Sequence, residues 1–101
     1  MSSSLIVQLD LHTLCREADV SADHVIAIVE HGIVEPRGRT PQDWLFDDQA
    51  PLLMRRAVKL HQQLQLEWED VALALELLDE VRQLRTENTR LRQQLGRFMQ
   101  R

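Results

Sequence analysis

Two apolar stripes at helical spacing lie between residues 11 and 29. They consist of Leu11, Leu14, Cys15 and Ala18, followed by Val25, Ile26, Ile28 and Val29. Asp10 or His12-Thr13 starts the first predicted helix, and the Ser21 hydroxyl caps the second by accepting a backbone N–H. Gly32 ends the second helix, because glycine adopts a left-handed conformation without steric cost. Two short helices joined by a tight turn have the outline of a helix-turn-helix.

Two short apolar pieces then flank a polar loop rich in Gly, Pro, Arg and Thr. The pieces are Ile33-Val34 and Trp44-Leu45-Phe46. This pattern predicts a small β-hairpin, the wing of a winged helix. Near the start of the chain, Leu5-Ile6-Val7 predicts a short edge strand or an ordered arm.

A third helix is predicted after the hairpin. We expect Asp47-Asp48 to cap it, with Pro51 in its first turn, where a missing N–H is harmless. Its expected apolar stripe runs to about Leu66 and consists of Leu52, Leu53, Ala57, Val58, Leu60 and Leu64. Leu66-Glu67-Trp68 forms a short joint.

From Glu67 onward there is no proline, and the only glycine is Gly96. This predicts one long helix, or two nearly continuous helices. Its first part is expected to pack on the globular body through Trp68, Val71, Leu75 and Leu78. We therefore divide the chain into a winged helix-turn-helix-like body at 1–66 and a long C-terminal helix at 67–101.

The later part of this helix carries a heptad pattern. Positions that alternate by three and four are Val81, Leu84, Asn88, Leu91, Leu95 and Phe98. This spacing keeps one seam facing a partner helix, so we predict a dimerising coiled coil and a homodimer. The alternative is that the helix folds back on its own body, which looks too small to cover six more apolar positions.

Charge is sorted along the long helix. Residues 67–80 hold six carboxylates and no Lys or Arg, whereas residues 82–101 hold six arginines against Glu87 alone. The helix macrodipole favours this polarity but hardly so complete a separation. In a parallel pair Glu80 and Glu87 meet Arg85 and Arg92 of the partner, while an antiparallel pair brings each acidic start near the other basic end. Both orientations fit.

Composition narrows the function classes. The 101 residues are 44% hydrophobic and 28% charged, and the net charge of −4 argues mildly against binding phosphates. A single cysteine, Cys15, suits a reducing compartment. The start, MSSSLIVQL, lacks a basic region and a long apolar run, so we expect no secretory signal and no membrane span, and a cytoplasmic protein.

No pattern in the sequence indicates catalysis. His12 and Cys15 are three residues apart, which on one helix can begin a metal site, but the other histidines are not spaced to complete it. A structural Cys15 and surface histidines are the simpler interpretation. There is no Gly-rich phosphate loop and no nucleophile with a partnered base. We predict neither an enzyme nor a metal or cofactor.

The order of elements resembles the MerR-type winged helix-turn-helix: mainly α, with a small β-hairpin wing and a long C-terminal helix forming a coiled coil. The stretch EHGIVEP (30–36) resembles the end of a MerR recognition helix. Within that group the chain is similar over nearly its whole length to the CbpM family of chaperone-modulatory proteins. The segments that carry this likeness are GIVEPR (32–37), WLFDD (44–48), RAVKL (56–60), residues 68–78 and ENTRLRQ (87–93).

The resemblance implies regulation by binding. A protein similar to this family is expected to bind the J-domain of CbpA, a DnaJ-like co-chaperone that also binds DNA. Such binding would block both the stimulation of DnaK by CbpA and the binding of CbpA to DNA. The alternative is a MerR-like DNA-binding transcriptional regulator. DNA-reading MerR proteins carry T-L-R-Y-Y-E and Y-R-x-Y motifs, whose arginines are replaced here by Ala27 and Leu45. Arg37 and Arg39 remain, but losing two phosphate contacts weakens DNA binding strongly.

J-domains of this type present a basic helix to an acidic surface of DnaK, so the resemblance points to an acidic surface here. The predicted partner-binding residues are Asp47, Asp48, Glu67, Glu69, Asp70 and Glu76, with Trp44 as a buried anchor. Trp68 is a second candidate anchor. Structural roles compete with these assignments, because Trp68 can pack the long helix on the body and Asp48 can cap a helix.

Overall fold

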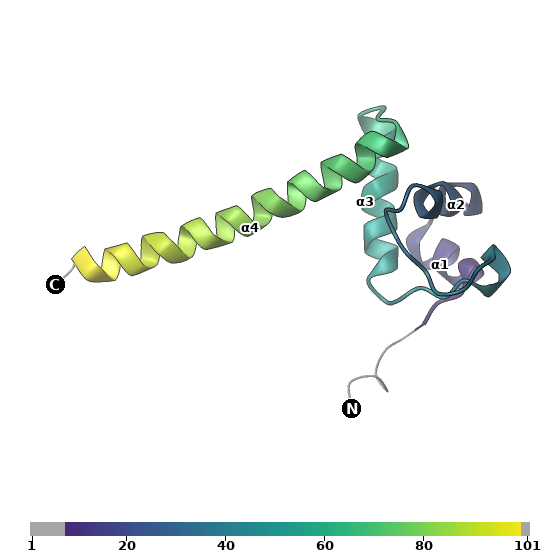
Figure 1. Cartoon of the computed structure of the whole chain (residues 1–101), viewed down its shortest axis with the longest axis horizontal. Coiled ribbons are helices and arrows are strands. Elements are labelled where there is room, and N and C mark those ends of the chain that lie inside the picture. The colour runs from purple at the N-terminus through teal and green to yellow at the C-terminus, as the bar shows by residue number, and fades with distance from the viewer. Residues whose placement is uncertain (1–7, 100–101) are drawn as a thin grey trace.

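The computed structural model describes residues 8–99, and its regular structure is helical. The elements are α1 (Leu11–Ala18), α2 (Ala22–Glu30), a short 3-10 helix η2 (Pro41–Asp43), α3 (Ala50–Gln63) and α4 (Trp68–Met99) (Figure 1). Helices α1, α2 and α3 pack together as a small body, and α4 extends away from it (Figure 1). The prediction of a mainly α fold is confirmed.

Local capping sets the bounds of the first two helices as the sequence predicts. The Asp10 carboxylate accepts a hydrogen bond from the Thr13 N–H at 2.8 Å, and the Ser21 hydroxyl accepts one from the His24 N–H at 3.2 Å. Gly32 follows α2 with φ +72°. The Gly32 N–H donates to the Val29 carbonyl and the Ile33 N–H to the Ile28 carbonyl, the paired bonds of a Schellman ending.

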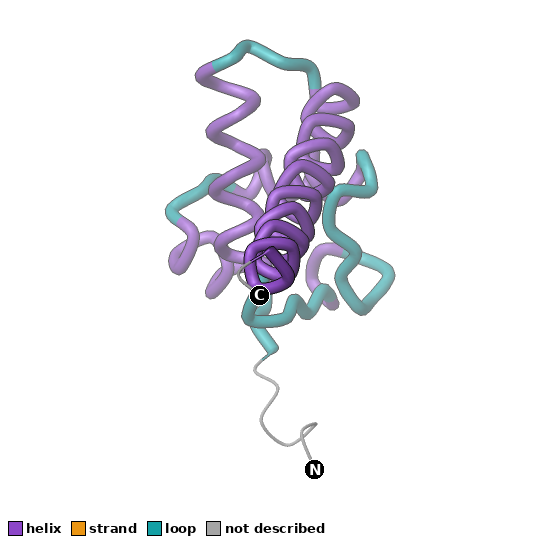
Figure 2. The backbone as a smooth tube through the Cα atoms, turned by 90° about the vertical axis from the view of Figure 1, so that its left-hand side faces the viewer, coloured by secondary structure: helices purple, strands orange, loops and turns teal. Residues whose placement is uncertain are grey.

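The predicted β-hairpin wing is wrong for this segment, because residues 8–99 contain isolated bridges and no strands (Figure 2). Arg37 and Leu45 exchange two backbone hydrogen bonds of 3.0 and 2.9 Å, and Leu9 pairs in the same way with Phe46. The next pair that would exchange such bonds is Arg39 with Asp43, but the Asp43 N–H donates to the Thr40 carbonyl at 2.8 Å instead, so the ladder ends there. The strand predicted at Leu5-Ile6-Val7 lies outside the described residues.

The chain reverses tightly at Gly38. Its φ is +103°, and a Cβ added there would lie 2.4 Å from the backbone oxygen of Asp43. Both the backbone angle and the close approach of η2 therefore require glycine at this position. The loop is closed by this contact and by the Arg37–Leu45 bridge, not by paired strands.

The core draws between one and three side chains from each of the four α-helices. Its largest fully buried members are Leu14, Val25, Ile28, Met54 and Val71. Trp44 and Phe46 close it from the loop, with their rings edge-on at 6.0 Å. Each of these elements depends on the others for burial, as expected of a domain with a small core.

The predicted apolar stripe of the third helix needs correction. The buried positions of α3 are Ala50, Met54 and Ala57, whereas Leu52 and Leu64 are 56% and 62% exposed. The small side chains at 50 and 57 allow α3 to approach the other helices closely, which sets its rotation. Neither aspartate caps α3: its N-cap is Gln49, whose N–H donates to the Asp47 carboxylate at 3.0 Å. Pro51 lies in the first turn, as predicted.

The long helix is continuous over 32 residues, as predicted. Val71 is fully buried and Trp68 and Leu75 are half-buried, but Leu78 is largely exposed. Residues 76–99 are all exposed, so the alternative in which this helix folds back on the body is contradicted. Figure 2 looks along α4 and shows the loop that joins it to α3.

Met54→Ala tests the corrected core of α3. We expect a loss of about 2–5 kcal/mol in the free energy of unfolding, because the side chain is fully buried and its removal leaves a cavity. The matched control Leu52→Ala, on the exposed side of the same helix, should change it by less than about 0.5 kcal/mol. Urea unfolding followed by circular dichroism measures both, and equal losses would contradict the assigned rotation of α3.

Candidate functional site

An aromatic joint fixes the start of α4. The Trp68 ring stacks on His61 of α3 with centroids 3.9 Å apart and planes 14° apart. His24 of α2 meets both rings edge-on, at 6.0 Å from Trp68 and 6.2 Å from His61. The His61 Nδ1–H donates to the Leu66 carbonyl at 2.7 Å, which ties α3 to the loop before α4. Trp68 is therefore half-buried and packs the start of α4 against α2 and α3.

An ion pair extends the joint to the end of α2. The His31 Nε2 lies 2.9 Å from the Glu69 carboxylate, and its Nδ1–H donates to the Ala27 carbonyl at 2.8 Å. The hydrogen bond to Ala27 and then the Glu69 charge raise the pKa of His31. One of the predicted partner-binding carboxylates thus already has a partner within the chain.

The predicted acidic residues form two groups. Asp47 and Asp48 precede α3, whereas Glu67, Glu69 and Asp70 follow it. Because α3 has 14 residues, its ends are about 20 Å apart. All of these side chains are exposed, and so is Glu76, which lies two turns beyond Glu69 on the same side of α4.

Trp44 is not available as an exposed anchor. Its side chain is only 7% exposed and packs edge-on against Phe46 inside the core. Its role as a partner anchor stays a prediction, and that role would require the ring to leave the core, which would expose a large apolar surface to water.

The predicted dimerisation residues lie together along the exposed part of α4. The set is Val81, Leu84, Asn88, Leu91, Leu95 and Phe98, and each member is exposed. Sequence reasoning missed Leu77, which is also exposed and lies one heptad before Leu84. Its spacing of seven residues from Leu84 could have identified it, but residues 68–78 were expected to pack on the body. The face opposite Val71 and Leu75 is thus apolar from Leu77 onward.

The helix-turn-helix lacks the side chains that contact DNA phosphates. Helix α2 contains no Lys or Arg and carries Asp23 and Glu30 at its exposed ends. Ala27 in the middle of α2 is half-buried. Arg37 and Arg39 lie exposed in the loop, where Arg37 forms the backbone bridge with Leu45. Nucleic-acid affinity depends on clustered cations, which this face does not offer.

Residues 8–99 contain no group of three or more His, Cys, Asp or Glu side chains placed to hold a metal ion. Cys15 is half-buried, and burial raises the pKa of its thiol. Within the same described range, no helix is both long and apolar enough to cross a membrane.

Comparison with known families first defines the class. A family model described as MerR HTH family regulatory protein matches residues 9–93, which spans α1 to most of α4. The fold and the match together define a helix-turn-helix regulatory protein, a class that is not a family of enzymes.

Comparison with curated relatives then narrows the class. Proteins named "Chaperone modulatory protein CbpM" from Pseudomonas putida strains GB-1 and KT2440 are 79% and 76% identical over 100 residues, with 99% of each chain covered. One with the same name from Escherichia coli O139:H28 is 37% identical over 97 residues, covering 96% of each chain. The chain belongs to the CbpM family, and the resemblance inferred from its sequence is confirmed.

His31→Gln tests the ion pair at the start of α4. Because the folded-state pKa of His31 is raised above its ordinary value of 6.5, its contribution to stability is fully present below pH 6.5 and is lost as the pH rises through the raised value. We expect the wild type to exceed the variant in free energy of unfolding most at acidic pH. Urea unfolding between pH about 5 and 8 measures the difference.

The control for this experiment is His12→Gln, at an exposed position of α1. It should leave the part of the pH dependence that comes from the His31–Glu69 pair unchanged, because His12 contacts neither residue. A His31→Gln variant whose stability follows the wild type at every pH would show that the ion pair makes no contribution.

Proposed function

We propose that this protein modulates a DnaJ-like co-chaperone of the CbpA type by binding its J-domain. Binding would block the co-chaperone's stimulation of DnaK and its own binding to DNA. The observation that carries this proposal is the full-length similarity to relatives named chaperone modulatory proteins, since 99% of the chain matches. The exposed acidic start of α4 supplies a surface suited to the basic helix of a J-domain.

The acidic surface of α4 is the proposed contact. It comprises Glu67, Glu69, Asp70 and Glu76, which are exposed, and no Lys or Arg occurs between residues 67 and 80. Opposite charge across such an interface orients the partners and speeds their encounter. Asp47 and Asp48 are a separate acidic pair about one helix length away, so they would touch a J-domain only at the edge of the interface.

Direct DNA reading is the second candidate function, and the helix-turn-helix family match favours it. The surface does not, because α2 has no cation and ends in Glu30, and the chain carries a net charge of −4. A steep loss of DNA affinity with salt is the signature that would support this alternative.

Charge reversal tests the J-domain proposal. We expect the triple variant E67K/D70K/E76K to bind a purified J-domain at least about tenfold more weakly, and to lose inhibition of J-domain-stimulated DnaK ATPase, because the acidic surface becomes basic. Isothermal titration calorimetry and an ATPase assay measure these effects. Glu69 is left in place so that its ion pair with His31 survives.

The matched control is E17K/E30K/E35K, which makes the same change in net charge at exposed positions of the body. It should keep an affinity within about twofold of the wild type, because its changes lie outside the interface. An equal loss of J-domain affinity in both triple variants, or an unchanged affinity in E67K/D70K/E76K, would show that the acidic surface is not part of the interface.

We also propose that α4 forms a homodimer through its exposed seam. The seam comprises Val81, Leu84, Asn88, Leu91, Leu95 and Phe98, extended by Leu77. A row of apolar side chains this long is costly to leave in water, and heptad spacing suits it to a second copy of the same helix. The separation of acidic and basic halves supports both parallel and antiparallel pairing, as the sequence already indicates.

The variant L84K/L91K tests the dimer. Two cations placed in the seam should shift the protein to a monomer in sedimentation equilibrium, because the partner seam offers no carboxylate at those positions. The control Q83K/Q93K places the same charges on α4 outside the seam and should remain dimeric. A wild type that sediments as a monomer would overturn the dimer proposal without affecting the J-domain proposal.

A further inference from the structure

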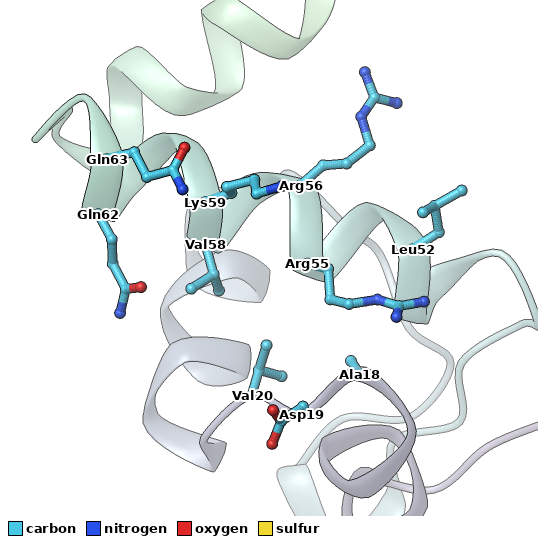
Figure 3. A pocket seen from close by; sticks show the side chains of 10 residues that line it. All are labelled: Ala18, Asp19, Val20, Leu52, Arg55, Arg56, Val58, Lys59, Gln62 and Gln63. Carbon is cyan, nitrogen blue, oxygen red and sulfur yellow. The ribbon is translucent and has the colours of Figure 1, made fainter.

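A basic groove lies between α3 and the turn that joins α1 to α2 (Figure 3). Its volume is about 620 Å³. Val58 and Gln62 of α3 point toward the turn, and Val20 points back toward them (Figure 3). Arg56 extends away from the turn on the outer side of α3 (Figure 3). The groove therefore has an apolar floor and a polar, basic rim.

Arg55 and Lys59 provide the cations of the rim, and Arg56 adds a third cation on the outer side of α3, in a chain whose net charge is negative. Within residues 8–99 no carboxylate oxygen lies within 4.0 Å of the side-chain nitrogens of these three residues. The acidic side chain that lines the groove is Asp19, at the turn. Cations gathered on one helix face without internal partners are available to an anionic ligand.

The groove is separate from both surfaces proposed above. Residues 56–60 form one of the segments by which the sequence resembles the CbpM family, and they supply Arg56, Val58 and Lys59 of the groove. The J-domain contact proposed above is acidic and the dimer seam lies on α4. The groove thus carries the opposite charge from the first surface and lies on a different helix from the second.

The spacing along α3 suits a helical ligand. Arg55, Val58 and Gln62 follow at i, i+3 and i+7, which places them along one side of α3 over about two turns, or roughly 10 Å. Leu52 is exposed at the end of this row and extends its apolar part. A ligand helix with an apolar stripe and flanking acids would place the stripe on Val20 and Val58 and its acids beside the cations.

We propose that this groove binds an acidic amphipathic helix of another protein. A phosphate backbone fits it less well, because Val20, Val58 and Ala18 offer it no hydrogen bonds and Asp19 repels it. The inference is independent of the proposed J-domain contact. It means that the protein presents surfaces of opposite charge, so that a basic and an acidic partner can bind it together.

Fluorescence anisotropy with a synthetic peptide tests this inference on the full chain. The probe is a labelled helix of about 16 residues with leucines on one face and glutamates beside them, long enough to hold helical structure. A shuffled peptide of the same composition has no apolar face. We expect the probe to bind at an ionic strength of about 0.15 M at least about tenfold more tightly than the shuffled peptide or a short DNA duplex.

The variant R55E/K59E should weaken probe binding at least about tenfold, whereas R37E/R39E, with the same charge change in the loop, should stay within about twofold. If R55E/K59E is misfolded by circular dichroism, L52S replaces it, because Leu52 is exposed and its loss should still weaken the probe. Equal binding of the shuffled peptide, tighter binding of DNA, or an unaltered affinity in these variants overturns the inference.

Sedimentation distinguishes another protein from a second copy as the occupant. The R55E/K59E variant should sediment with the same mass as the wild type. A lower mass for this variant would mean that the groove binds a second copy of the chain, and the inference would fail.

Discussion

Val71 is the residue of α4, between Trp68 and Met99, whose side chain is wholly buried, and the position of the whole long helix depends on that burial. The Trp68–His61 stack and the His31–Glu69 pair hold the same first turn of α4. Beyond them α4 has no support from the body, because residues 76–99 are all exposed. A helix anchored at one end and apolar along its outer face has a strong physical reason to pair, since isolated helices gain most of their stability from packing.

Charge divides the molecule into parts suited to different partners. The acidic start of α4 and the basic rim of α3 are close in sequence but face different neighbours, because the joint after α3 turns the chain back. The net charge of −4 does not reveal this separation of acidic and basic surfaces. Local charge, rather than the total, determines which ligand approaches which surface, because screening in physiological salt limits each charge to a range of about 8 Å.

The helix-turn-helix keeps the local signals that define its two helices, although α2 has no Lys or Arg. Asp10 and Ser21 cap the helices, and Gly32 ends α2 with a positive φ. These three residues set the bounds of the two helices through backbone hydrogen bonds and backbone conformation. Ala27 in the middle of α2 and Leu45 in the loop carry no charge, so these two positions offer no cation to a phosphate.

Features that depend on a few neighbouring residues follow from the amino-acid sequence alone. Helix bounds at Asp10, Ser21 and Gly32, the continuity of α4, the exposed heptads and the family were all predictable, because capping, helix breaking and spacing act within one or two turns. Only the tertiary structure decided which side of α3 is buried, that Trp44 belongs to the core, that the wing reduces to single bridges and that the acidic residues separate into two groups. Burial and proximity depend on which distant elements pack together. Helix α3 is about 20 Å long, so the carboxylates before its first residue lie far from those after its last residue.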